Sequence, residues 1–254
     1  MPNAHSSAVT RVFRIIRMVI HTLYGMIIAT LLLPRANPRQ RDAIISGWST
    51  SLLTLLNVRV VTRGNLPGPD VTSTMFVANH ISWVDIHALN TVRAVRFIAK
   101  SEVRGWPVFG WFAQKSNTLF IDRSKKQDAG RIVEVVTESL NAGDCLCYFP
   151  EGTTTDGTEL KAFKGSILQA AINTESMVWP FTVRYPNADG SANTDMAYWG
   201  EMSLVDSIWL VLSQRSPVVE LEFLPQVSPR GHERRGLTIL VRNTIAGKLN
   251  LPHE

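Results

Sequence analysis

The sequence predicts an α/β domain with a mixed, mostly parallel sheet flanked by helices, preceded by two apolar helices. From residue 58 onward, short runs rich in β-branched and aromatic residues alternate with helical segments, which is typical of a sheet covered by helices. A long apolar stretch precedes this region, and 254 residues suffice for one domain with a substantial core. We therefore expect two parts, a helical segment at 1–57 and the domain at 58–254.

The apolar stretch from Val12 to Leu33 decides how the chain relates to a membrane. From Met18 to Leu33 it carries no Asp, Glu, Lys or Arg. A helix of that length reaches about 24 Å at ~1.5 Å per residue, which is short of a hydrocarbon core of ~30 Å. Arginines lie on both flanks, so the charge bias gives no orientation for a span.

A second apolar helix is expected from Ala43 to Leu56, because Pro34 and Pro38 should end the first one. Two short helices joined by a basic turn are predicted to enter one leaflet of a membrane and return. Residues 1–57 would then be the membrane attachment, and the bilayer a partner. The alternative is a pair of core helices packed on the domain.

The remaining elements follow from hydrophobic periodicity and turn residues. Strands are expected at 58–62, 74–78, 95–99, 118–121, 145–149, 178–184 and 218–223. Helices are expected at 82–89, 101–113, 128–140, 164–172, 206–212 and 234–249. Gly105 and Pro107 interrupt the helix at 101–113. Together these segments alternate strand and helix, as a mostly parallel sheet requires.

The chain is basic, with 26 Lys and Arg against 21 Asp and Glu and a net charge of +5. Such a surface favours an anionic partner, either nucleic acid or an anionic membrane leaflet. Nucleic acid is disfavoured because the basic residues are spread along the chain and no recognition module is visible. Cys145 and Cys147 are too close together for a disulfide and too few for a metal site. We therefore expect a reducing compartment and no metal site. No cofactor is expected either.

Polar side chains follow three predicted strands, in NHISWVD at 79–85, FIDR at 120–123 and FPEGTTT at 149–155. Ligands of open α/β sheets bind at such carboxyl ends. On a regular helix His80 and Asp85 would face different ways, because five residues rotate by about 500°. If the helix begins at Ser82 instead, Asp85 in its first turn can fold back to the imidazole. The carboxylate then fixes the ring tautomer, and the other ring nitrogen can take a proton from a hydroxyl.

The same residues also fit a capping box, in which Asp85 reaches the Ser82 backbone and His80 is only a loop residue. The sequence contains no G-x-S-x-G, no Walker-type loop, no G-x-G-x-x-G and no histidine pair at metal-binding spacing. If the chain is an enzyme, a His–Asp pair acting on a substrate hydroxyl is the machinery it offers. His87 is interpreted as a packing or surface residue. Four aromatic residues could line an acyl-chain groove or belong to the core: Trp106, Phe109, Trp111 and Phe112.

Four blocks occur in order: N-H-x-x-x-x-D at 79–85, F-I-D-R at 120–123, F-P-E-G-T at 149–153, and V-W-P at 178–180. At these separations they resemble the blocks of the glycerolipid acyltransferases, which include bacterial 1-acylglycerol-3-phosphate acyltransferases. The resemblance extends from about residue 58 to 185, and the apolar N-terminus looks like the family's membrane-attached helical pair. It implies a glycerol-3-phosphate acyltransferase-like fold. It also implies transfer of a fatty acyl group from a thioester, on coenzyme A or acyl carrier protein, to the free hydroxyl of a lysolipid in phospholipid biosynthesis.

The resemblance implies roles for individual residues. His80 would be the general base and Asp85 its orienting partner. Arg123, Glu151, Gly152 and Thr153 would hold the acceptor's polar head. Apart from the resemblance, Ser82 and Lys100 are further candidates for binding the substrate. Backbone N–H groups of the E-G-T loop are candidates for stabilising an oxyanion. The alternatives are a solvated turn at Glu151 and a surface ion pair at Arg123.

Position 154 departs from the family pattern. Members that acylate lysophosphatidate usually carry Arg there, whereas this chain has Thr154, which cannot give a phosphate the bidentate hydrogen bonds of a guanidinium. The runs at 97–111 and 149–157 look similar to the branch of lyso-ornithine lipid acyltransferases, whose acceptor has no phosphate. The general expectation is a 1-acylglycerol-3-phosphate acceptor, with lyso-ornithine lipid as the alternative.

A further alternative from another functional class is a non-catalytic basic protein that binds a membrane surface. Such a protein has no need for His80 and Asp85 together. For either kind of protein we expect membrane association on the cytoplasmic face of the inner membrane.

Overall fold

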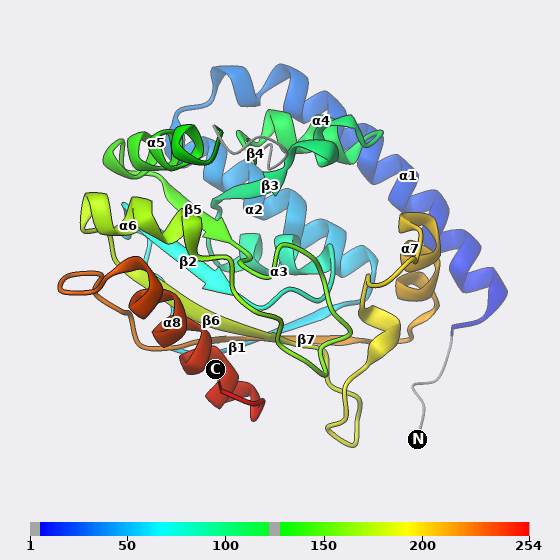
Figure 1. Ribbon diagram of the computed structural model, residues 1–254. Coiled ribbons are helices and arrows are strands. Elements are labelled where there is room, and N and C mark those ends of the chain that lie inside the picture. Colours follow the sequence, from blue (N-terminus) through cyan, green and yellow to red (C-terminus); the bar gives the residue numbers. More distant parts are fainter. Residues whose placement is uncertain (1–5, 122–127, 254) are drawn as a thin grey trace.

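The computed structural model describes residues 6–121 and 128–253 (Figure 1). Within these residues, seven strands form one sheet in the order β1-β7-β6-β2-β5-β3-β4. All neighbouring strands are parallel except β6 and β7. The strands are β1 (Arg59–Gly64), β2 (Thr74–Ala78), β3 (Arg96–Lys100), β4 (Leu119–Ile121), β5 (Cys145–Tyr148), β6 (Val178–Arg184) and β7 (Val218–Phe223). The expected mixed, mostly parallel sheet is confirmed.

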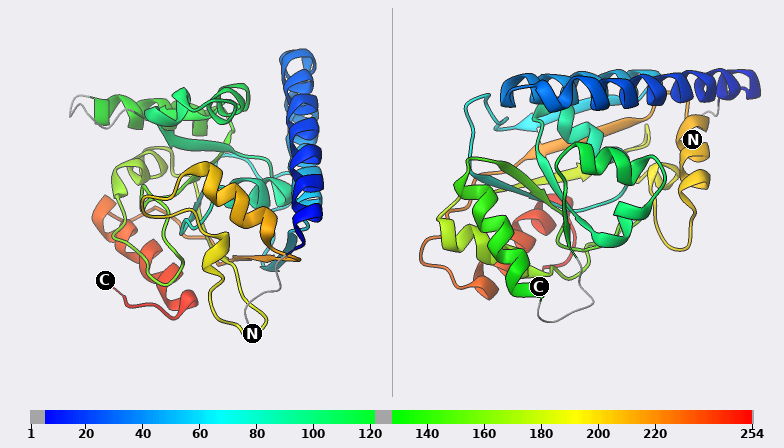
Figure 2. Two further views of the ribbon diagram at one scale, coloured as in Figure 1. Left: turned by 90° about the vertical axis from the view of Figure 1, so that its right-hand side faces the viewer. Right: turned by 90° about the horizontal axis from the view of Figure 1, so that it is seen from above.

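Helices cover both faces of this sheet (Figure 2). One face packs against α2 (Pro38–Leu55), α3 (Val84–Val92) and α7 (Leu204–Ser213), with α4 (Phe109–Lys115) at the margin. The other face packs against α5 (Asp128–Asn141), α6 (Leu168–Thr174) and α8 (Arg234–Leu249). The domain is therefore a three-layer α/β/α arrangement with one hydrophobic core on each side of the sheet.

The central strand β2 supplies both cores, because successive side chains of a strand point to opposite faces. Phe76 and Ala78 belong to the core beneath α2 and α3, whereas Met75 and Val77 belong to the core beneath α6 and α8. Every residue of β2 is buried. The loop that follows β2 therefore leaves the middle of the sheet and starts from a rigid base.

The helical boundaries near the N-terminus differ from the expectation. Pro38 does not end a helix but begins α2, because Asn37 and Gln40 form a capping box and proline is favoured in the first helical turn. The first helix, α1 (Ala8–Leu31), starts earlier than expected because Ser7 caps it. Pro34 lies in the short 3₁₀ turn between the two helices.

The expected helix at 101–113 is also divided. A 3₁₀ turn at Ser101–Gly105 is separated from α4 by Trp106, Pro107 and Val108. Val108 has a φ of 64°, a conformation that costs a β-branched residue energy and ends any continuous helix at this point.

Helix α1 lies along the outer side of α2 (Figure 2). Its buried face includes Arg14, whose guanidinium donates to the carbonyl oxygens of Leu212 and Gln214 at 3.0 and 2.5 Å. The opposite face is apolar and uncovered, with eight side chains between 50% and 61% exposed: Val12, Phe13, Ile16, Val19, Ile20, Leu23, Tyr24 and Ile27. They recur every three or four residues and so form one stripe. Helix α1 is therefore not a core helix, although it packs on the domain.

By length and hydropathy, the helical stretch Ala8–Arg35 could cross a membrane, and it is the one such stretch in the part of the chain described. Only 11% of its apolar window is buried. Helix α2 differs, because Leu52, Leu53 and Leu56 lie in the core. Residues 38–55 are thus packed as part of the domain.

Candidate active site

The candidate site lies at the carboxyl ends of the parallel strands. Asn79 and His80 follow β2, Phe149 and Glu151 follow β5, and Tyr185 follows β6. Because these strands are neighbours in the order β6-β2-β5, their loops meet at one edge of the sheet. Asn79 secures the first loop, since its side chain exchanges two hydrogen bonds with the backbone of Val183 in β6, at 2.9 and 2.8 Å.

His80 and Asp85 form a hydrogen-bonded pair. The distance from His80 Nδ1 to Asp85 Oδ2 is 2.8 Å. The same oxygen also accepts from the backbone N–H groups of Ile81 at 2.8 Å and Ser82 at 3.0 Å. One oxygen of Asp85 therefore holds both the imidazole and the backbone of the turn before α3. The predicted helix start at Ser82 is wrong, because α3 begins at Val84 and its N-cap residue Trp83 makes no side-chain capping hydrogen bond.

Burial divides this pair into a supporting and an accessible member. The Asp85 side chain is 1% exposed, whereas that of His80 is 18% exposed. With Nδ1 bonded to a carboxylate, Nδ1 carries the proton of the neutral ring and Nε2 is the free base. Nε2 has no partner among the described residues.

An aromatic side chain fixes the plane of the imidazole. The rings of His80 and Phe149 stack with centroids 3.9 Å apart and an interplanar angle of 8°. Phe97 stacks on Phe149 in turn, with ring centroids 6.2 Å apart. The orientation of His80 is thus set by a hydrogen bond at its edge and by packing on its face.

Glu151 is buried beneath the His80 loop. Its Oε1 accepts from the N–H of His80 at 2.8 Å, and its Oε2 accepts from the N–H of Lys161 at 2.9 Å. The side chain is 3% exposed, and burial raises the pKa of this carboxyl above its usual value, although the two backbone hydrogen bonds oppose that shift. Both carboxylate oxygens are therefore committed to backbone donors.

The remainder of the 149–155 loop offers backbone donors near the histidine. The Gly152 N–H donates to Phe149 O at 3.1 Å in a tight turn for which Gly152 adopts a φ of 69°. Thr155 N–H donates to His80 O at 2.9 Å and ties the two loops together. The N–H groups of Thr153 and Thr154 have no acceptor within the described ranges. Two amides thus remain available where a developing negative charge needs donors.

The other predicted binding residues have different surroundings. Ser82 is fully buried, and its side chain is hydrogen-bonded to the N–H of Val84 at 3.4 Å and to the hydroxyl of Tyr185. Lys100 ends β3 at the same edge of the sheet and is exposed, as is Thr153. Arg123 lies outside the described residues. The headgroup roles assigned to these side chains stay predictions.

One residue of the site was missed at the level of sequence. The Tyr185 hydroxyl donates to Asp85 Oδ1 at 2.6 Å, and Tyr185 is 3% exposed. Burial, together with the charge of Asp85, raises the pKa of Tyr185 well above its usual value. Its position directly after a strand of the fourth block is a signal that could have drawn attention to it.

The interpretation of His87 as a packing residue is confirmed. Its ring meets Trp48 edge-on at 5.4 Å and lies within 3.4 Å of Ser49 Oγ. Burial lowers the pKa of His87 to about 4. Two of the aromatic residues predicted near it also pack inside the protein. The ring of Phe112 lies 5.0 Å from that of Trp48, and the ring of Phe109 lies 6.2 Å from that of Trp83.

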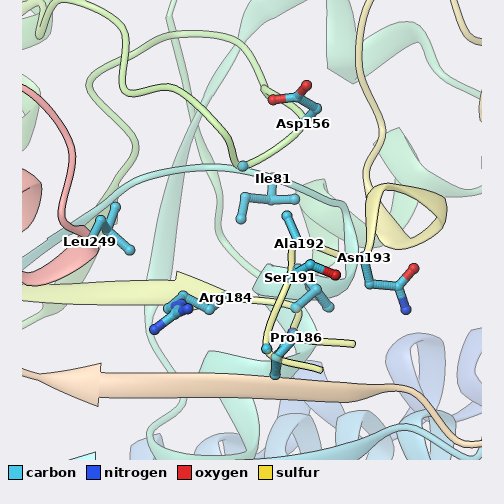
Figure 3. A pocket seen from close by; sticks show the side chains of 11 residues that line it. Ile81, Asp156, Arg184, Pro186, Ser191, Ala192, Asn193 and Leu249 are labelled. Atoms are coloured by element: carbon cyan, nitrogen blue, oxygen red, sulfur yellow. The ribbon is translucent and has the colours of Figure 1, made fainter. Parts of the chain in front are cut away.

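A pocket lies on the β6 side of the His80 loop (Figure 3). Ile81, Asp156 and Arg184 line it. Tyr185 and residues 190–193 complete most of the wall. The pocket thus adjoins the His80 loop at Ile81. In the described part of the chain, no group of three or more His, Cys, Asp and Glu side chains is placed to hold a metal ion.

Comparison with known proteins identifies the family. A model of the acyltransferase family matches residues 57–184. A lyso-ornithine lipid O-acyltransferase of Pseudomonas aeruginosa is 32% identical over 197 residues, which cover 78% of this chain and 74% of the relative. A 1-acyl-sn-glycerol-3-phosphate acyltransferase of Neisseria gonorrhoeae is 30% identical over 188 residues, covering 74% of this chain and 72% of the relative. The crystal structure of the 1-acyl-sn-glycerophosphate acyltransferase PlsC of Thermotoga maritima aligns with a TM-score of 0.65 and 23% identity, over 93% of this chain and 96% of that one.

These findings confirm the resemblance that the four blocks indicated. The solved structure supports the fold, and the matched residues 57–184 include the His80 loop and the Glu151 loop. The protein is an enzyme that transfers acyl groups, so the alternative of a non-catalytic surface-binding protein is not supported. The chain belongs to the acyltransferase family.

Proposed function

We propose that the protein moves a fatty acyl group from an acyl thioester to the free hydroxyl of a lysolipid, with His80 as the general base. The observation that carries the proposal is the geometry of one ring. Nδ1 of His80 is held by Asp85, Nε2 is without a partner among the described residues, and the ring lies at the edge of the sheet where ligands bind. That arrangement suits removal of a proton from an alcohol.

The proposed reaction is a direct transfer in two steps. His80 Nε2 takes the hydroxyl proton of the acceptor while its oxygen bonds to the thioester carbonyl carbon, and Asp85 stabilises the imidazolium that forms. The tetrahedral oxyanion is met by the free N–H groups of Thr153 and Thr154. When the C–S bond breaks, the imidazolium returns its proton to the leaving sulfur. The products are an ester and the free thiol of coenzyme A or acyl carrier protein.

A covalent intermediate on the protein is not needed, and the nearby nucleophiles are poorly placed for one. Ser82 is fully buried, and its N–H is bonded to Asp85. Cys147 is fully buried, and burial, together with the charge of Asp85, raises the pKa of its thiol well above the usual value. A buried neutral thiol is a weak nucleophile. The acceptor's own hydroxyl is therefore the proposed nucleophile.

The proposed acceptor is of the 1-acylglycerol-3-phosphate type, with lyso-ornithine lipid as the second candidate. A relative named for the first activity and a relative named for the second are similar to this chain at nearly equal identity. One observation favours the second candidate. Thr154 stands where a phosphate-binding arginine is usual, and its Oγ1 donates to the backbone oxygen of Tyr198. Its hydroxyl is thus occupied in fixing the loop. Lys100 is an exposed cation at this edge of the sheet, and it favours the first candidate.

The proposed location is the membrane interface, on the cytoplasmic face. The stripe on α1 is apolar and uncovered, while the opposite face of α1 is packed on the domain through Arg14. A helix so placed can lie in the interface with the stripe in the lipid, whereas a span would require it to leave the domain. The two free cysteines agree with a reducing compartment.

A competition assay tests the proposed function. Membranes containing the protein receive a labelled acyl thioester with equal amounts of lysophosphatidate and lyso-ornithine lipid, and membranes without the protein are the control. We expect label in the diacylated product of lysophosphatidate; label mainly in ornithine lipid would assign the second acceptor. If neither lipid gains label above the control, lysolipid acylation is wrong.

A further inference from the structure

A buried hydroxyl completes the surroundings of Asp85. Tyr185, at the carboxyl end of β6, donates from its hydroxyl to Asp85 Oδ1 at 2.6 Å. The other carboxylate oxygen, Oδ2, receives His80 Nδ1 and two backbone N–H groups. The two oxygens therefore have separate tasks, because one faces the imidazole and the other is held from the neighbouring strand.

Asp85 depends on these donors because it is 1% exposed. A buried carboxylate without hydrogen bonds is strongly unfavourable, and a single carboxylate oxygen left without a donor also costs free energy. Among the described residues, Tyr185 supplies the only hydrogen bond to Oδ1. It thus fixes the plane of the carboxylate from the side opposite His80.

Tyr185 remains a donor throughout the working pH range. Its hydroxyl is buried beside a negative charge, and both conditions disfavour the tyrosinate. The titratable groups that face Asp85 are the His80 ring, the Tyr185 hydroxyl and the Cys147 thiol on β5, and Glu151 faces the backbone of His80. Only the first two are hydrogen-bonded to the Asp85 carboxylate.

We propose that Tyr185 is a positioning residue, the third member of a His80–Asp85–Tyr185 chain that orients the base and sets how strongly it holds a proton. The inference rests on the proposed role of His80. A donor on Oδ1 draws negative charge away from Oδ2, so the imidazole opposite Oδ2 holds its proton less firmly. Removal of the hydroxyl therefore has two consequences: a less well oriented base, and a base that loses its proton only at higher pH.

The test compares Tyr185→Phe with a matched control in the full chain, in detergent or lipid. Tyr148→Phe is the control, because Tyr148 is equally buried, donates to the backbone oxygen of Lys164 and lies in the opposite core. We expect Tyr185→Phe to lower kcat by about 10- to 100-fold, the range for a hydrogen bond to a charged group, with KM for thioester and acceptor unchanged. The acid limb of its kcat profile should move to higher pH. Tyr148→Phe should retain both kcat and profile.

A double-mutant cycle separates action through Asp85 from a general packing effect. In an Asp85→Asn background, Tyr185→Phe should change kcat by less than about threefold, because the group it acts on is already altered. An equal loss in both backgrounds would overturn the proposal. So would wild-type kcat and pH profile in Tyr185→Phe, or a loss of activity that only follows loss of folded protein. A different result would contradict the proposed function itself, namely that His80→Ala retains turnover.

Discussion

The backbone N–H of His80 donates to Oε1 of Glu151 at 2.8 Å, so the acid of the third block holds the histidine of the first. Its other oxygen holds the N–H of Lys161. With both oxygens engaged and 3% exposure, Glu151 acts on the position of the His80 loop.

Glu151→Gln should therefore lower kcat more than it changes KM. The amide replaces one acceptor by an N–H₂ group that faces a backbone donor, and such a buried mismatch costs about 1–3 kcal/mol. We expect kcat to fall by about 10- to 100-fold while KM for the lysolipid changes less than about threefold. Steady-state kinetics with varied acceptor provide the check. A rise in KM at constant kcat would instead show that Glu151 binds the headgroup.

The uncovered stripe of α1 should set membrane affinity. Ile20 is 61% exposed within the stripe, whereas Leu66 is 50% exposed in the loop after β1. Ile20→Glu should weaken binding to anionic vesicles at least tenfold, since burial of one such side chain in lipid contributes about 1.5–3 kcal/mol. Leu66→Glu should bind like the wild type. Equal vesicle co-sedimentation of the two variants would place the membrane contact elsewhere.

Close packing between the first two helices depends on one glycine. A Cβ at Gly25 would lie 2.3 Å from Trp48 Nε1, whereas a Cβ at Gly47 would meet no atom within 4 Å. Gly25→Ala should lower the free energy of unfolding by about 1–3 kcal/mol through overpacking. Gly47→Ala should raise it by about 0.5–1 kcal/mol, because alanine is the better helix former. Denaturant unfolding measures both, and equal effects of the two substitutions would refute the packing of α1 on α2.

His87 should make stability depend on acid pH. Burial, with a smaller contribution from the charge of His21, lowers the pKa of His87 from 6.5 to about 4. The unfolded chain thus takes up this proton at higher pH than the folded chain. The contribution of neutral His87 to the free energy of unfolding is therefore fully present above pH 6.5 and declines as the pH falls toward 4. The loss should be about 1–3 kcal/mol.

The comparison of two histidine variants checks this expectation. The free energy of unfolding is measured at pH 7 and at pH 4.5 for His87→Gln and for His232→Gln, a substitution in an exposed loop. His87→Gln should lose less stability on acidification than the wild type, and His232→Gln should lose as much. An unchanged pH dependence in His87→Gln would contradict the lowered pKa.

The sheet could be predicted because its strands are short apolar runs between turn residues, and the pattern of β2 follows directly from two-sided burial. The start of α2 could also have been predicted, since N-P-R-Q at 37–40 is a capping-box signature. The break at Val108 could not, because nothing in its side chain favours a positive φ.

For the site, local spacing allowed the pairing of His80 with Asp85, which are five residues apart. The contact of Tyr185 with Asp85 spans 100 residues and depends on which strands are neighbours, so no local pattern contains it. The sequence could not predict either which way the Glu151 carboxylate faces. A loop carboxylate can face a ligand or the backbone, and only the folded loop shows that it accepts from His80 and Lys161.

The central claim is that the His80 imidazole deprotonates the acceptor, and its most direct test is single-turnover acyl transfer by purified His80→Ala. The account predicts a rate at least about 100-fold below the wild type, as expected for loss of a general base, with membrane binding and thermal unfolding unchanged. His232→Ala, in an exposed loop, should retain the wild-type rate. A His80→Ala protein that transfers acyl groups at the wild-type rate would contradict the account.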